Sequence, residues 1–103
     1  MEKTLDISLM RLAAADATAV LKALGNEDRL LLLCQMSQGE KSVSELETLL
    51  DIRQPTLSQQ LAVLRSEDLV NTRRDGKRIY YSIADPKLLN LLGVLYELYC
   101  PTK

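Results

Sequence analysis

Apolar side chains recur at helical spacing through most of the chain and predict five helices. The first is expected over residues 5–24, where leucines repeat on either side of an alanine run, and Gly25 ends it. The second is expected over Glu27–Ser37, after Asn26 as its N-cap residue. It is apolar nearly all round, so it should be buried on most sides.

Two shorter helices follow in close succession. Ser42 begins the third, because Ser42 and Glu45 have the S-x-x-E spacing of a capping box. After a brief turn over residues 51–53, the fourth is expected from Gln54 to Glu67, with Pro55 in its first turn, where a proline loses no helical hydrogen bond. Its buried stripe is Leu57, Leu61 and Leu64.

Beyond Leu69 the period of the pattern changes from helical to alternating. Residues 70–73 and 79–83 are rich in strand formers, and the Asp75-Gly76 pair between them is a strong hairpin-turn signal. A last helix is expected over Lys87–Tyr99, closed by Pro101. The order is ααααββα, which predicts one mainly α domain over residues 1–103 with a β-hairpin.

The third and fourth helices and the hairpin have the layout of a winged helix-turn-helix, with the helix-turn-helix at about 42–67 and the wing at about 69–83. A major groove admits a helix whose short polar side chains reach base edges, and a basic hairpin tip can contact phosphates. The candidate DNA-binding residues are Gln54, Thr56, Ser58, Gln59 and Gln60 on the helix, and Arg73, Arg74, Lys77 and Arg78 on the wing. On spacing alone, a merely solvated polar surface is an equal alternative.

Composition changes this picture little. The 103 residues include four Tyr but no Phe or Trp, so the core should be aliphatic. The net charge of −1 taken alone argues against a nucleic-acid binder, but residues 53–82 carry 6 basic and 3 acidic side chains. No apolar run is long enough for a membrane span, and no secretory signal is evident at the N-terminus, so a cytoplasmic protein is expected.

Three segments carry a family resemblance: Leu24–Leu30, Gln54–Arg65 and Arg73–Ile83. They resemble the second-helix start, the recognition helix and the wing of the ArsR/SmtB family of bacterial repressors. One departure is Gln60, where that family usually has His; an amide can still donate to a phosphate. The resemblance implies a DNA-binding repressor rather than an enzyme, with no cofactor.

The same resemblance implies a homodimer through the first and last helices, at about 5–24 and 86–99, that reads an inverted-repeat operator in double-stranded DNA. Two leucine stripes fit this interface, although packing within one chain is the alternative. The stripes are Leu5, Leu9 and Leu12 on the first helix, and Leu88, Leu91 and Leu95 on the last.

Members of this family are commonly released from DNA by a signal, often a metal. The third helix here begins Ser42-Val43-Ser44-Glu45 without a thiol, and the chain has no His, so no metal site is expected. The pair Cys34 and Cys100 instead resembles the persulfide-sensing branch of BigR-, SqrR- and HlyU-like repressors. A persulfide or polysulfide inducer that bridges these thiols, by a disulfide or a longer sulfur link, is therefore expected.

Several alternatives remain. Cys34 could be a small core residue and Cys100 an exposed bystander. The repressor could sense oxidants in general, or a metal. A pure dimerisation module would have no role in DNA binding. A thiol-redox enzyme is disfavoured, because the chain lacks a Cys-x-x-Cys motif, a His base and a Gly-rich cofactor loop.

Overall fold

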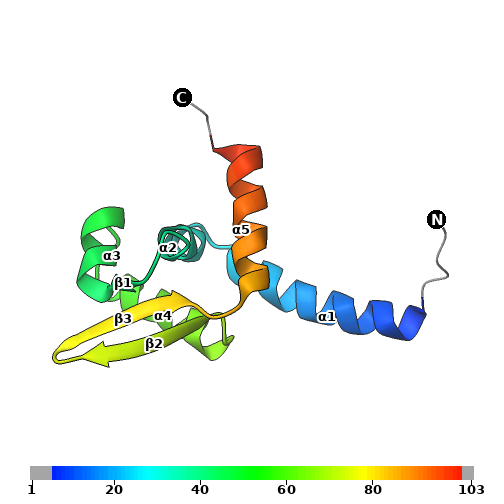
Figure 1. The fold of residues 1–103 in the computed structure, drawn as a ribbon, viewed down its shortest axis with the longest axis horizontal. Helices are drawn as coiled ribbons and strands as arrows, with labels where there is room; N and C mark the ends of the chain where they lie inside the picture. The colour runs from blue at the N-terminus through cyan, green and yellow to red at the C-terminus, as the bar shows by residue number, and fades with distance from the viewer. Residues whose placement is uncertain (1–5, 101–103) are drawn as a thin grey trace.

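The computed structural model describes residues 6–100, so the expected positions of Leu5 and Pro101 lie outside the described residues. The predicted order ααααββα is confirmed, and a two-residue strand is added before the third helix (Figure 1). The elements are α1 (Ile7–Leu24), α2 (Glu27–Met36), β1 (Lys41–Ser42), α3 (Val43–Leu50), α4 (Thr56–Ser66), β2 (Val70–Asp75), β3 (Arg78–Ile83) and α5 (Pro86–Tyr99).

Side-chain caps set where the first three helices begin. The Asp6 carboxylate accepts from the Ser8 N–H at 2.8 Å, and α1 starts between them. Asn26 caps α2, as predicted. The capping box of Ser42 and Glu45 is also confirmed, since each side chain accepts from the other residue's backbone N–H. These bonds satisfy N–H groups that have no partner inside a helix.

The fourth helix starts later than predicted. It begins at Thr56, and Pro55 occupies the cap position without a side-chain capping bond. The amide oxygen of Gln54 accepts from the Ser58 N–H at 3.1 Å and thereby serves a free donor in the first turn. Gln54 therefore lies just before the helix and caps it from outside.

The sheet has three antiparallel strands in the order β1-β3-β2. The hairpin turns at Gly76 and Lys77, where the positive φ of 65° at Gly76 suits a residue without a side chain. Strand β1 pairs through Lys41 with Tyr81 and through Ser42 with Tyr80. It was not predicted, because two residues carry no alternation that a sequence pattern can reveal.

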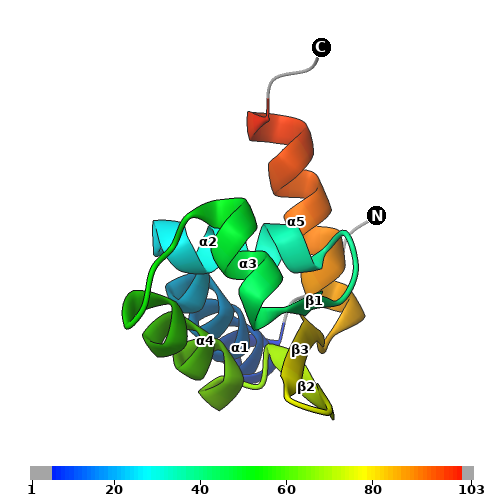
Figure 2. The ribbon, with the colours of Figure 1, turned by 90° about the vertical axis from the view of Figure 1, so that its left-hand side faces the viewer.

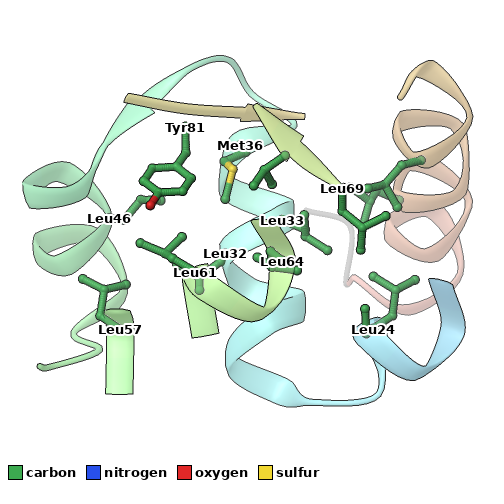
Figure 3. Close-up of a cluster of buried hydrophobic side chains, with 14 of the residues drawn as sticks. Leu24, Leu32, Leu33, Met36, Leu46, Leu57, Leu61, Leu64, Leu69 and Tyr81 are labelled. Carbon is green, nitrogen blue, oxygen red and sulfur yellow. The ribbon is translucent and has the colours of Figure 1, made fainter. Parts of the chain in front are cut away.

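An aliphatic core lies between the helices and the hairpin, as expected (Figure 3). The predicted stripe of α4 is confirmed, because its three leucines are all buried. The expectation for α2 holds only in part, since Leu31 is exposed. The buried hydrophobic residues are Ala23, Leu24, Leu32, Leu33, Met36, Leu46, Ile52, Leu57, Leu61, Leu64, Leu69, Val70, Tyr81, Leu88 and Leu92.

Helices α1 and α5 project from this core in different directions (Figures 1 and 2). On α1, Leu9 and Leu12 are 64% and 65% exposed. On α5 the predicted outward stripe is wrong: Leu88 is 4% exposed, and Leu91 and Leu95 pack against the core. Core packing uses that face of the helix, so a different set of apolar residues is exposed: Leu89, Val94, Tyr96, Leu98 and Tyr99. Within residues 6–100, no helix has the length and apolar character to span a membrane.

Candidate nucleic-acid interface

The outer face of α4 carries short polar side chains. Burial of its leucine stripe turns the opposite arc outward, so Ser58 and Gln59 are exposed and Thr56 is half-buried. Gln54 is exposed just before the helix, and its amide oxygen also accepts from the Ser58 hydroxyl at 2.6 Å. The Gln54 NH₂ group can still donate, so this end of the helix presents both donors and acceptors.

Gln60 is placed differently from the other four candidates. It is half-buried, and its amide oxygen accepts from Arg29 Nη1 at 2.8 Å. Arg29 belongs to the first turn of α2, so Gln60 is directed toward the body of the domain. Sequence reasoning did not assign a role to Arg29. Arg29 could have been identified from the sequence, because it lies in the Leu24–Leu30 segment that carries the family resemblance.

The wing separates two neighbouring arginines by the alternation of its strands. Arg74 is opposite Ile79, and Arg73 is opposite Tyr80, so the two arginines point to opposite faces of the hairpin. Arg73 donates to both carboxylate oxygens of Glu40, at 2.9 and 2.7 Å, and its guanidinium lies 4.6 Å from the centre of the Tyr80 ring. Arg73 is therefore engaged within the domain.

The ion pair also affects the acid group. The hydrogen bond from Arg73, helped by its positive charge, holds the pKa of Glu40 below its usual value. At neutral pH the carboxylate is thus charged and paired. Arg74, Lys77 and Arg78 are exposed at the hairpin tip.

A groove of about 700 Å³ runs between α3, α4 and the hairpin. Ser58 of the polar helix face lines it together with Lys77 and Arg78 of the wing. Arg65, near the end of α4, lines the same groove and was not singled out as a site residue. Two of the four wing candidates and one helix candidate thus border a single concave surface with a basic rim.

The two cysteines are both free in the described structure, too far apart for a bond but near enough for their charges to interact. Cys34 is half-buried on α2 and packs against the core, whereas Cys100 is exposed at the end of α5. Burial raises the pKa of the Cys34 thiol, and the charge of a Cys100 thiolate raises this pKa further. Among residues 6–100, no group of three or more His, Cys, Asp or Glu could hold a metal ion.

Helix α4, the second helix of the helix-turn-helix, has a polar outer face and lies beside a basic hairpin. This arrangement defines a winged helix-turn-helix domain that binds DNA. The family model described as "Bacterial regulatory protein, arsR family" matches residues 26–72. The chain is 49% identical to the biofilm growth-associated repressor of Agrobacterium fabrum, with 97% of this chain and 90% of that protein covered. The chain belongs to the arsR family of bacterial regulatory proteins, as the sequence resemblance predicted.

Solved structures agree with this assignment. The transcriptional repressor BigR from Xylella fastidiosa superposes with a TM-score of 0.87 at 41% identity, covering 95% of this chain and 100% of that one. Reduced HlyU from Vibrio cholerae gives a TM-score of 0.85 at 39% identity, covering 89% and 97%. The chain is therefore a BigR-like transcriptional repressor of the arsR family and not an enzyme.

Proposed function

We propose that this chain works as a homodimer that represses transcription from an inverted-repeat operator and is released when reactive sulfur bridges Cys34 and Cys100. The observation that carries DNA binding is the shared groove, where Ser58 of α4 meets Lys77 and Arg78 of the wing. A duplex seated there would place α4 in its major groove and the hairpin tip along its phosphates.

The proposed interface comprises the helix residues Gln54, Thr56, Ser58 and Gln59 and the wing residues Arg74, Lys77 and Arg78. Gln60 and Arg73 contribute through other contacts, because each is bound to another side chain of the domain. Phosphate contacts set affinity and its salt dependence, whereas the polar side chains of α4 would discriminate between bases.

Dimerisation is supported by the apolar surface of the two projecting helices. Leu9 and Leu12 on α1, and Leu98 and Tyr99 on α5, are all more than half exposed. Exposed apolar side chains in such numbers mark a surface that another protein covers. A second copy related by a two-fold axis would place the two recognition helices about one DNA turn apart, which fits an inverted repeat.

The two thiols suit different steps of sulfur transfer. Cys100 is exposed, so its thiolate can attack the outer sulfur of a persulfide RSSH and release RSH, leaving Cys100–S–SH. A second RSSH extends this group to Cys100–S–S–SH. The Cys34 thiolate then attacks the added sulfur bound to Cys100 Sγ and expels HS⁻, which closes a trisulfide. The raised pKa of Cys34 keeps it mostly as a thiol until this step.

A bridge between the two cysteines would change the geometry of the helix-turn-helix. A relaxed disulfide needs Cα atoms within about 7 Å, and each added sulfur lengthens the reach by up to about 2 Å. The cysteines are apart in the described structure, so bridging requires α2 and the end of α5 to approach each other. Since α2 packs against the helix-turn-helix, this movement would alter the spacing between the recognition helices of a dimer and weaken operator binding.

Mass spectrometry combined with a DNA-binding assay tests this function. The reduced protein is treated in parallel with a glutathione persulfide donor, oxidised glutathione and hydrogen peroxide. We expect a bridge with added sulfur after the persulfide alone, together with release of DNA. Equal release by peroxide would indicate a general oxidant sensor instead. Persulfide-driven release from a Cys100→Ser variant would contradict the bridge, and Cys34→Ser is the matched control for the resolving thiol.

A further inference from the structure

The guanidinium of Arg29 joins three segments of the domain. Its Nε donates to the carbonyl oxygen of Ala23 at 2.7 Å, and its Nη2 donates to that of Lys22 at 3.2 Å. Both carbonyls are in the last turn of α1, where the regular helical partners run out, and the Lys22 oxygen also accepts from the Gly25 N–H at 3.2 Å. Its Nη1 donates to Gln60 Oε1 on α4 at 2.8 Å. A single side chain from α2 thus ties the end of α1 to the recognition helix.

Few other contacts fix α1 against α4 at this point. A hollow of about 680 Å³ lies between them, lined on α1 mainly by small side chains such as Ala15 and Ala19, on α4 by Val63, and just after α4 by Glu67. Most of the α1 side chains that face this hollow are short and offer little to interlock with α4, so packing alone constrains the angle weakly. Arg29 borders the same hollow.

We infer that Arg29, acting through Gln60, is a positioning residue that sets the angle between α1 and the recognition helix. The planar guanidinium holds its N–H donors in a fixed fork, so it constrains the relative positions of the three oxygen atoms that accept from it. Because α1 belongs to the surface proposed for dimerisation, this angle determines how far apart two recognition helices lie. Arg29 therefore contributes to the half-site spacing that the dimer accepts.

This inference rests on the proposed DNA binding and assigns Gln60 a role different from a direct phosphate contact. If Gln60 touched DNA independently, its replacement would weaken binding equally with or without Arg29. If Gln60 acts through Arg29, the two replacements affect one interaction, and their effects are not additive.

The test is a double-mutant cycle on operator spacing. A binding site is first selected by the wild-type protein from a random-sequence duplex library, and versions with one base pair added or removed between the half-sites are then made. The variants are Arg29→Lys, which keeps the charge but loses the fork, Gln60→Met, which keeps the length but loses the acceptor, and the double variant. Gln38→Met, which makes the same change at an exposed residue in the turn after α2, is the matched control for surface changes away from the link.

We expect each single variant to bind the native spacing about tenfold more weakly, from the loss of a charge-assisted hydrogen bond, and the double variant to be no weaker than either. Each should also discriminate less between native and altered spacings, which a general loss of stability would not produce. Circular dichroism identifies variants that fail to fold, and Gln60→Met alone then carries the spacing measurement. Unchanged spacing discrimination, or additive losses in the double variant, would overturn the inference. Failure of the wild-type protein to select any site would instead contradict the proposed DNA-binding function on which this inference rests.

Discussion

Arg73 and Glu40 form a two-point ion pair between the wing and the loop before β1, with Nε–Oε2 and Nη2–Oε1 distances of 2.9 and 2.7 Å. The Tyr80 ring lies against the same guanidinium. This arrangement fixes one of the four basic side chains of the hairpin to the body of the domain. It therefore orients the wing rather than adding to its free positive charge.

The ion pair should give stability a measurable pH dependence. The folded-state pKa of Glu40 is lowered, so its stabilising contribution is present above the ordinary pKa of a glutamate and is lost as the pH falls through the lowered value. We expect acidification from about pH 6 to pH 3 to destabilise the wild type more than Glu40→Gln. Urea unfolding at each pH measures the difference. Parallel pH profiles for the two proteins would show that the ion pair does not contribute to the pH dependence of the free energy of unfolding.

The two neighbouring arginines of the wing should differ in their effect on DNA binding. Arg74 is on the same face of the hairpin as its partner Ile79, a residue that lines the groove, whereas Arg73 is bound to Glu40. We expect Arg74→Ala to reduce the slope of log affinity against log salt concentration by about 1 per protomer, since one phosphate contact is lost. Arg73→Ala should change this slope less. Fluorescence anisotropy over a salt series checks both variants, and equal slopes would contradict the assignment of faces.

Exposed leucines on α1 predict the oligomeric state. Leu12 is 65% exposed on α1, so Leu12→Glu should place a charge in the proposed dimer interface without disturbing the core. Sedimentation equilibrium should then find a monomer where the wild type is a dimer. Leu49→Glu, which changes an exposed leucine on α3, is the control and should remain dimeric. A dimeric Leu12→Glu protein would argue for a different interface.

The thiol of Cys34 should be alkylated slowly near neutral pH. Its pKa is raised by burial first and by the charge of Cys100 second, so less thiolate is available than for an ordinary cysteine. In a Cys100→Ser variant the second cause is removed, and the pKa should move part of the way back. The rate of iodoacetamide labelling against pH, followed by mass spectrometry, measures it. Full return to the ordinary value would mean that burial has no effect.

The core should be sensitive to the loss of side-chain volume on α2. Leu33 is fully buried between helices, and Leu33→Ala should lower the free energy of unfolding by about 3 kcal/mol, because apolar contacts are lost and a cavity remains. Leu31→Ala, at an exposed position on the same helix, should cost much less. Urea unfolding at one fixed protein concentration allows the comparison, since a dimer's stability depends on concentration. Similar losses for both variants would contradict the observed packing.

Local features of this fold could be predicted from the sequence because near neighbours in the chain produce them. The α4 leucine stripe, the Asn26 cap and the capping box of Ser42 and Glu45 follow from helical periodicity and from hydrogen bonds spanning three residues. The turn at Gly76 follows from a preference of its own backbone. The family could be predicted as well, because each of its motifs is a continuous stretch of the chain.

Only the tertiary structure decided which of these residues face one another. Arg73 meets Glu40 across 33 positions and Arg29 meets Gln60 across 31, and no local pattern announces either pair. The same holds for α5, where helical spacing gave a stripe containing Leu88 but not the side of the helix that the core would cover. Local chemistry determined the elements of this repressor, whereas long-range packing determined which basic and polar side chains remain free for DNA.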